Sequence, residues 1–114
     1  MNKFTTGRLV EPKTKSFNDK VNAASIVVFG GKKHAWIGIN AKAGPWIYTS
    51  NGTELVFENW DQGEPNDDSH DCVHFWRKGK WADYPCYAKL FFICELSFGF
   101  NQLNYISFRE RIAF

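Results

Sequence analysis

The sequence of 114 residues lacks the features of several large protein classes. Its 14 basic and 12 acidic side chains give a formal net charge of only +2, so no basic excess indicates a nucleic-acid partner. No apolar run reaches the roughly 18 residues that a membrane-spanning helix needs, and the first ten residues lack the apolar stretch of a signal peptide. If the protein is secreted, we therefore expect this sequence to be a mature form or a fragment.

Motifs of nucleophilic enzymes are also missing. No Gly-x-Ser-x-Gly elbow occurs, and the neighbouring Cys72 and His74 have no evident orienting partner. We therefore expect a protein that is not an enzyme.

Cysteine is scarce, and its count of three is odd. Cys72 and Cys86 would enclose a loop of about 15 residues if they paired, worth about 3 kcal/mol in the chain-entropy model. Cys94 would then remain, either as a small buried apolar side chain or as a residue whose partner lies outside this chain.

Aromatic residues, in contrast, are abundant: they make up 18% of the chain, with 11 Phe and 5 Trp, and they supply core area to a small domain. A helix is predicted for residues 14–26, with Ser16 as its cap and an apolar stripe of Phe17, Val21 and Ala24. Most of the remaining chain is β-prone, and Gly38 within one strand suggests that another backbone or ring passes close by. Strands are predicted for residues 35–39, 46–49, 72–76, 81–83 and 90–94. The sequence thus predicts an α+β domain, with one helix against a mainly antiparallel sheet.

The polar segment from Gly63 to Asp83 carries the strongest chemical signal. Glu64, Pro65 and Asn66 follow one another directly, and Asp83 returns after one strand and one tight turn. An X-Pro bond reaches the cis form at low cost, so both flanking side chains can point the same way. Carboxylate and amide oxygens are the ligands that calcium prefers, and we therefore predict a calcium site here.

Several segments together resemble the C-type lectin-like domain, in its mannose-type sugar-binding branch. They occur in the family's order over roughly residues 7–95. The matching segments are Gly7–Val10, Trp36–Ile39, Trp46–Tyr48 with its Asn-Gly turn, Asn59-Trp60, Gly63–Asn66, Asp71–Val73, Trp81–Asp83, Cys86 and Phe92–Glu95.

The resemblance implies a fold, a site and partners. The fold is one or two helices against small antiparallel sheets with a long irregular ligand-binding loop, and Cys72 and Cys86 would form the disulfide beneath that loop. Glu64, Asn66 and Asp83 would bind calcium and carbohydrate, with the Glu-Pro-Asn order typical of mannose, glucose and fucose binders. The implied partners are glycans or glycoproteins, met outside the cell, as in innate immunity.

The sequence also departs from the family pattern. Ala82 replaces an asparagine that would bind the ion and the sugar, and His70 replaces an acidic ligand. Asp67, Asp68 or Asp71 is therefore expected as a substitute ligand in a weak site, and Asp71 is included in the predicted set. The family's first strand and helix, with the cysteine that would pair with Cys94, would lie before Met1.

The missing first strand and helix predict how the chain is divided. Residues 1–95 would form a partial domain and residues 96–114 an apolar tail of unknown role, packing as an extra helix or strand. We expect the strand edge around residues 92–94 to be covered by this tail, by a second copy or by a partner chain; otherwise the chain would fold poorly alone.

Two alternatives remain open. The same fold could act without calcium as a protein-binding domain. His70, Cys72 and His74 alternate and could bind zinc if Cys72 were a free thiolate, although we expect His74 to be an exposed strand residue.

Asn51 begins a glycosylation sequon at an exposed turn.

Overall fold

One helix and seven strands form the regular structure of the residues described by the computed structural model, which are 6–30, 34–41, 44–98 and 103–109. This is the α+β composition that the sequence predicts. In chain order the elements are β1 (Thr6–Leu9), α1 (Lys15–Phe29), β2 (Ala35–Asn40), β3 (Ile47–Tyr48), β4 (Cys72–Arg77), β5 (Lys80–Tyr84), β6 (Phe91–Phe98) and β7 (Leu103–Arg109).

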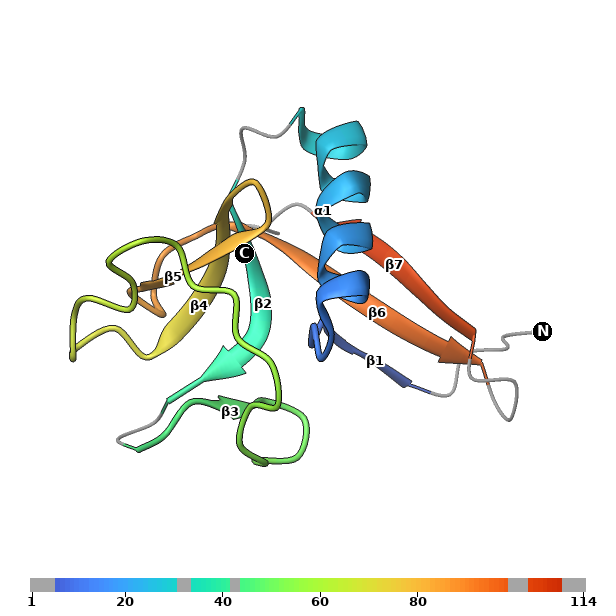
Figure 1. Ribbon diagram of the computed structural model, residues 1–114. Coiled ribbons are helices and arrows are strands. Elements are labelled where there is room, and N and C mark those ends of the chain that lie inside the picture. The colour runs from blue at the N-terminus through green and yellow to red at the C-terminus, as the bar shows by residue number, and fades with distance from the viewer. Residues whose placement is uncertain (1–5, 31–33, 42–43, 99–102, 110–114) are drawn as a thin grey trace.

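All seven strands join into one sheet. Its main path runs β1-β6-β2-β4-β5, with β3 paired to β2 and β7 paired to β6. Within the described residues, β2 and β6 pair in parallel and the other strand pairs are antiparallel. Helix α1 lies along the part of the sheet formed by β1, β6 and β7, while the β4–β5 hairpin and the long loop before it lie toward the opposite end (Figure 1).

The N-cap of helix α1 lies two residues before the predicted one. The N-cap is Thr14 rather than Ser16, because Thr14 has extended backbone angles and its hydroxyl accepts a hydrogen bond of 3.0 Å from the Phe17 amide. The helix continues to Phe29, and Gly30 ends it with a left-handed φ of 69° and a 2.8 Å bond from its amide to the Ile26 carbonyl.

The helix is joined to the β4–β5 hairpin by a buried side chain. Asn18 is fully buried; its amide donates to the Gly79 carbonyl at 3.0 Å and its oxygen accepts from the Trp81 indole at 2.9 Å. Both polar ends of Asn18 are therefore satisfied in the core. Trp81, itself fully buried, begins the segment that carries Asp83, so this contact fixes the position of β5.

The expectation for Gly38 is confirmed. A Cβ at this position would lie 2.8 Å from the Leu9 carbonyl oxygen and 2.9 Å from the Glu11 Cγ. The Gly38 amide also donates to the Val10 carbonyl at 2.7 Å. The segment after β1 therefore passes directly against β2, and only glycine leaves room for it.

The C-terminal segment continues the sheet. Strand β6 extends to Phe98, past residue 95 where we predicted a domain boundary, and β7 pairs with it from Phe92 to Phe98. Of the predicted alternatives for the tail, a strand is therefore correct for 103–109, whereas 99–102 and 110–114 lie outside the described residues. The edge of β6 is covered by the chain itself, which removes the reason for expecting a partner chain there. No helix among the described residues has the length and apolarity needed to cross a membrane.

Candidate functional site

A proline-bent loop and β5 build the candidate site. The Glu64–Pro65 bond is cis, and Gly63 before it has a φ of 81°. The loop precedes β4 in the chain and packs against β5, where the Asp61 amide donates to the Trp81 carbonyl at 2.9 Å. Further along, the loop contacts β5 again at Asp83.

The three predicted calcium ligands meet in one place. The Asp83 carboxylate is buried and accepts from the backbone amides of Asn66 at 2.9 Å and Asp67 at 3.1 Å. The Asn66 side-chain amide donates to Glu64 Oε2 at 3.1 Å. Glu64, Asn66 and Asp83 all line one cavity of about 200 Å³. The structure thus brings these three residues to one cavity.

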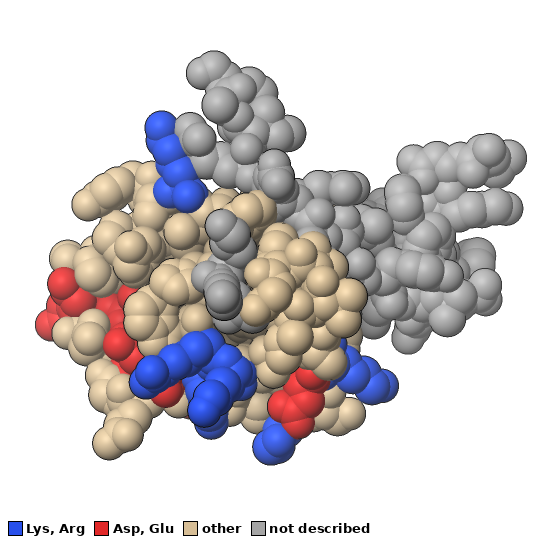
Figure 2. All heavy atoms as spheres, turned by 90° about the horizontal axis from the view of Figure 1, so that it is seen from above, with Lys and Arg blue, Asp and Glu red and all other residues tan. Residues whose placement is uncertain are grey.

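The electrostatics of this cavity favour a cation. The Oε1 atom of Glu64 is buried and has no hydrogen-bond partner. Burial and the neighbouring Asp83 carboxylate raise the pKa of Glu64 to about 7. Acidic side chains gather at the left edge of the surface in Figure 2, the side on which Figure 1 places the loop before β4. A divalent cation would neutralise the charge that makes ionisation of Glu64 unfavourable.

The same cavity has few protein ligands. Ala82, whose methyl group offers no oxygen, lines it beside Asp83. In the described part of the chain, no group of three or more His, Cys, Asp or Glu side chains could hold a metal ion. A calcium site here would therefore depend on the Asn66 amide and on oxygens from water or a ligand, since calcium takes six to eight oxygens.

Two other predicted residues differ in their positions. His70 also lines this cavity, with Nε2 3.4 Å from Asp67 Oδ2 and Nδ1 3.6 Å from Asp83 Oδ2. Asp71 does not line the cavity of Glu64; it lines a separate depression together with Asp67, Asp68 and His70. The structure therefore does not bring Asp71 together with the other three predicted ligands.

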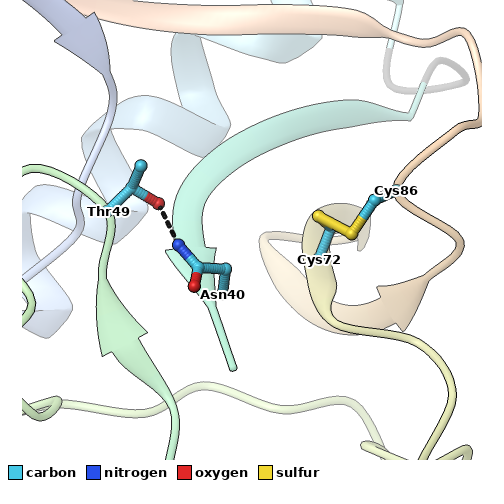
Figure 3. The surroundings of a disulfide bond; sticks show 4 residues. All are labelled: Asn40, Thr49, Cys72 and Cys86. Carbon is cyan, nitrogen blue, oxygen red and sulfur yellow. Dashed lines mark hydrogen bonds between the residues drawn. A yellow bond between two sulfur atoms is a disulfide. The ribbon is translucent and has the colours of Figure 1, made fainter. Parts of the chain in front are cut away.

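The cysteines exclude the zinc alternative. Cys72 and Cys86 form a disulfide, as the resemblance implied, and it lies near the hydrogen bond of 2.9 Å between Asn40 and Thr49 (Figure 3). A sulfur in a disulfide is not a thiolate ligand, so the predicted set of His70, Cys72 and His74 is wrong. Cys94 takes no part in this disulfide.

The expectation that His74 is an exposed strand residue is wrong. His74 is 1% exposed rather than a surface residue, and neither Nδ1 nor Nε2 has a hydrogen-bond partner. Its ring packs at centroid distances of 4.8 Å from Tyr84 and 5.6 Å from Trp76. The alternation of strand β4 could not reveal this, because its neighbours Val73 and Phe75 are buried as well.

The predicted glycosylation residue lies at an exposed turn. The Asn51 side-chain oxygen accepts from the Thr53 amide at 3.0 Å and from the Thr53 hydroxyl at 2.8 Å. The Asn and Thr side chains of the sequon therefore contact each other on the surface.

Comparisons with known proteins agree with this architecture. The family model described as the lectin C-type domain matches residues 3–96. Collectin-11 of Danio rerio is 33% identical over 93 residues, which is 78% of this chain and 34% of collectin-11. A C-type lectin mannose-binding isoform of Notechis scutatus scutatus is 39% identical over 72 residues, covering 57% of this chain and 45% of that one. The solved structure of the EPNH mutant of CEL-I matches with a TM-score of 0.71 and 24% identity, over 81% of this chain and 69% of that one.

One helix against this sheet, with the loop bent at a cis proline beside β5, defines a C-type lectin-like fold. The chain belongs to the lectin C-type domain family. It spans only 34% of the length of the collectin that it matches, and the likeness to CEL-I supports the fold alone.

Proposed function

We propose that this domain is a non-enzymatic recognition module that binds carbohydrate of the mannose, glucose or fucose type with the help of calcium. Glu64, Asn66 and Asp83 would hold the ion. The single observation that carries the proposal is the convergence of these three side chains on one cavity, where Glu64 has a buried oxygen without a partner.

The name of one relative supports the class of ligand. The matching protein of Notechis scutatus scutatus is described as a mannose-binding isoform. This chain carries Glu64-Pro65-Asn66 in the order that the family resemblance associates with mannose-type binding. The sugar itself is our proposal, because the matched segments cover less than half of that relative.

The side chains divide the work of binding. Asp83 shapes the loop, because both of its oxygens accept backbone amides from Asn66 and Asp67. The Asn66 amide donates to Glu64 Oε2 at 3.1 Å, which leaves Glu64 Oε1 as an acceptor without a partner, and such an acceptor suits a hydroxyl group. When bound, calcium would supply positive charge and open coordination positions for two neighbouring hydroxyls. We expect a calcium Kd of about 10⁻⁴ to 10⁻³ M, as in other extracellular modules with few ligands.

The second candidate is a calcium-independent, protein-binding domain. It is favoured by Ala82, which brings no oxygen to the cavity, and by the two loop amides that already occupy the Asp83 carboxylate. In that case Asp83 would serve only to hold the loop in place through these two amides.

Calorimetric titration with methyl α-mannoside would separate the two candidates. We expect binding in millimolar calcium that is lost with a chelator and restored when calcium is added back. Replacement of Glu64 by Gln should abolish the calcium-dependent binding, whereas Glu54→Gln, a matched change at an exposed glutamate outside the cavity, should retain it. Binding that persists in the chelator would contradict the calcium mechanism and favour the second candidate.

We also propose that the domain works outside the cell. The disulfide between Cys72 and Cys86 supports this, because disulfides persist in oxidising compartments. Asn51 would then be available for glycosylation at its exposed turn. Mass spectrometry of the protein secreted from a eukaryotic host, before and after glycosidase treatment, checks both statements.

A further inference from the structure

Unsatisfied polar atoms concentrate around the candidate cavity. Among the described residues, five buried side-chain atoms lack a hydrogen-bond partner, and four of them belong to Glu64, His70 and His74, which line this cavity. Two of the four are the ring nitrogens of His74, which is 1% exposed. Buried polar groups are nearly always hydrogen-bonded, so a fully buried histidine with two unsatisfied nitrogens calls for a partner.

Space is available beside His74 because its neighbour on the paired strand is small. His74 pairs directly with Ala82 across the β4–β5 ladder, so the two side chains lie on the same face of the sheet. Both residues line the cavity together with Glu64 and Asn66. Because Ala82 ends at its methyl group, the imidazole borders volume that a longer side chain at this position would fill.

The imidazole is uncharged at neutral pH. It is packed against the rings of His34, Trp36, Trp76 and Tyr84. Burial and the nearby His34 lower the pKa of His74 to about 4, although the Asp83 carboxylate acts in the opposite direction. A neutral imidazole has one N–H donor and one acceptor nitrogen. A hydroxyl group, which both donates and accepts, matches this pair better than a carboxylate or an ammonium group does.

We propose that His74 is a specificity-determining contact residue, whose imidazole hydrogen-bonds one hydroxyl of a bound carbohydrate that enters the space beside Ala82. The inference rests on the proposed carbohydrate binding and adds to it. Glu64 and Asn66 would bind one pair of hydroxyls at the mouth of the cavity, and His74 would select a further hydroxyl on the same sugar. The ligands favoured are therefore hexoses with an additional hydroxyl directed into the cavity, rather than their deoxy analogues.

The test is affinity across a panel of methyl mannosides that each lack one hydroxyl. His74→Phe keeps an aromatic ring in the cluster but removes both nitrogens. In the unmodified chain, loss of the selected hydroxyl should weaken binding about three- to tenfold, the range of one neutral hydrogen bond. In His74→Phe the parent mannoside should bind that much more weakly, and the same deoxy analogue should cause no further loss. His34→Phe is the matched control, since His34 packs against His74 but does not line the cavity, and its panel should resemble that of the unmodified chain.

The outcomes distinguish the inference from the function on which it rests. If the unmodified chain binds no mannoside with calcium, the proposed function fails and the role of His74 fails with it. If it binds and the His74→Phe panel is unchanged, only the inference is overturned. If His74→Phe does not fold, Ala82→Val fills the adjoining space without altering the imidazole and should produce the same loss for the same hydroxyl. An unchanged panel for Ala82→Val would then overturn the inference.

Discussion

At the scale of single residues, the cavity brings together groups that are unfavourable for the stability of the fold. Glu64 and Asp83 are two carboxylates held together, and Glu64 has one buried oxygen without a donor. Burial disfavours the charged form of Glu64, and the nearby Asp83 carboxylate adds to this effect, which is why the pKa of Glu64 rises. Such groups cluster at functional sites, where a ligand compensates for the unfavourable interaction.

Glu64 therefore gives a pH dependence of known sign. Its pKa rises from 4.5 in the unfolded chain to about 7 in the fold, so the folded state binds more protons between these values. The contribution of Glu64 to the free energy of unfolding should consequently fall as pH rises from about 4.5 to about 7 in metal-free protein. Glu64→Gln should remove this loss, so that the metal-free variant is more stable than the unmodified chain above about pH 7.

Thermal unfolding with and without calcium would check this prediction. Calcium should stabilise the unmodified chain, because it binds the folded state, and should leave Glu64→Gln unchanged. Glu54→Gln, at an exposed position outside the cavity, should show the pH profile and the calcium response of the unmodified chain. A Glu64→Gln variant that is less stable than the unmodified chain at neutral pH without calcium would contradict the account.

At the scale of elements, the close approach of the β1 segment to β2 positions the centre of the sheet. Gly38→Ala would place a Cβ 2.8 Å from a backbone oxygen of Leu9, and a backbone atom cannot move aside as a flexible side chain can. We expect a loss of about 1–3 kcal/mol in the free energy of unfolding, typical of an overpacked core. Gly44→Ala is the control, because no atom lies within 4 Å of its added Cβ. Urea unfolding of both variants measures the difference, and equal stability of the two would show that this approach does not constrain β2.

Local signals in the sequence were sufficient for several elements. The helix, β2 and the β4–β5 hairpin follow from apolar periodicity and turn residues, although the helix cap was assigned to Ser16 instead of Thr14. The parallel pairing of β2 with β6 has no local signal, since it joins residues far apart in the chain. Propensity indicates that a strand exists, whereas its partner is decided by packing.

The candidate site could be predicted from the sequence only in part. The grouping of Glu64, Asn66 and Asp83 follows from their oxygen donors and the predicted hairpin, and the family resemblance implies it as well; the structure brings these side chains together. The burial of His74 could not be predicted from its own strand, because it depends on aromatic rings supplied by β2, β4 and β5. Asp71 was expected from its place in the sequence beside the loop, but its side chain lines another depression.

At the scale of the whole molecule, β7 determines how the sheet ends. It pairs with β6 along seven positions from Phe92 to Phe98 and thereby covers an edge that would otherwise expose unpaired amide and carbonyl groups. The same strand β6 also pairs with β1 and β2, so it connects the two halves of the sheet. A change in β7 should therefore affect the stability of the sheet at a distance from the candidate cavity.

Truncation after Phe98 tests this role. Without β7 the amides of β6 should exchange with solvent much faster, and the exposed edge should pair with other copies, giving association that increases with concentration. A chain ending at Arg109 keeps all of β7 and should match the full chain in both measurements. Hydrogen exchange by mass spectrometry and sedimentation velocity would report the two effects. Slow exchange in β6 together with a monomer after truncation at Phe98 would mean that β7 is dispensable. In that case the pairing of β1 and β2 with the other side of β6 would be sufficient to hold the sheet.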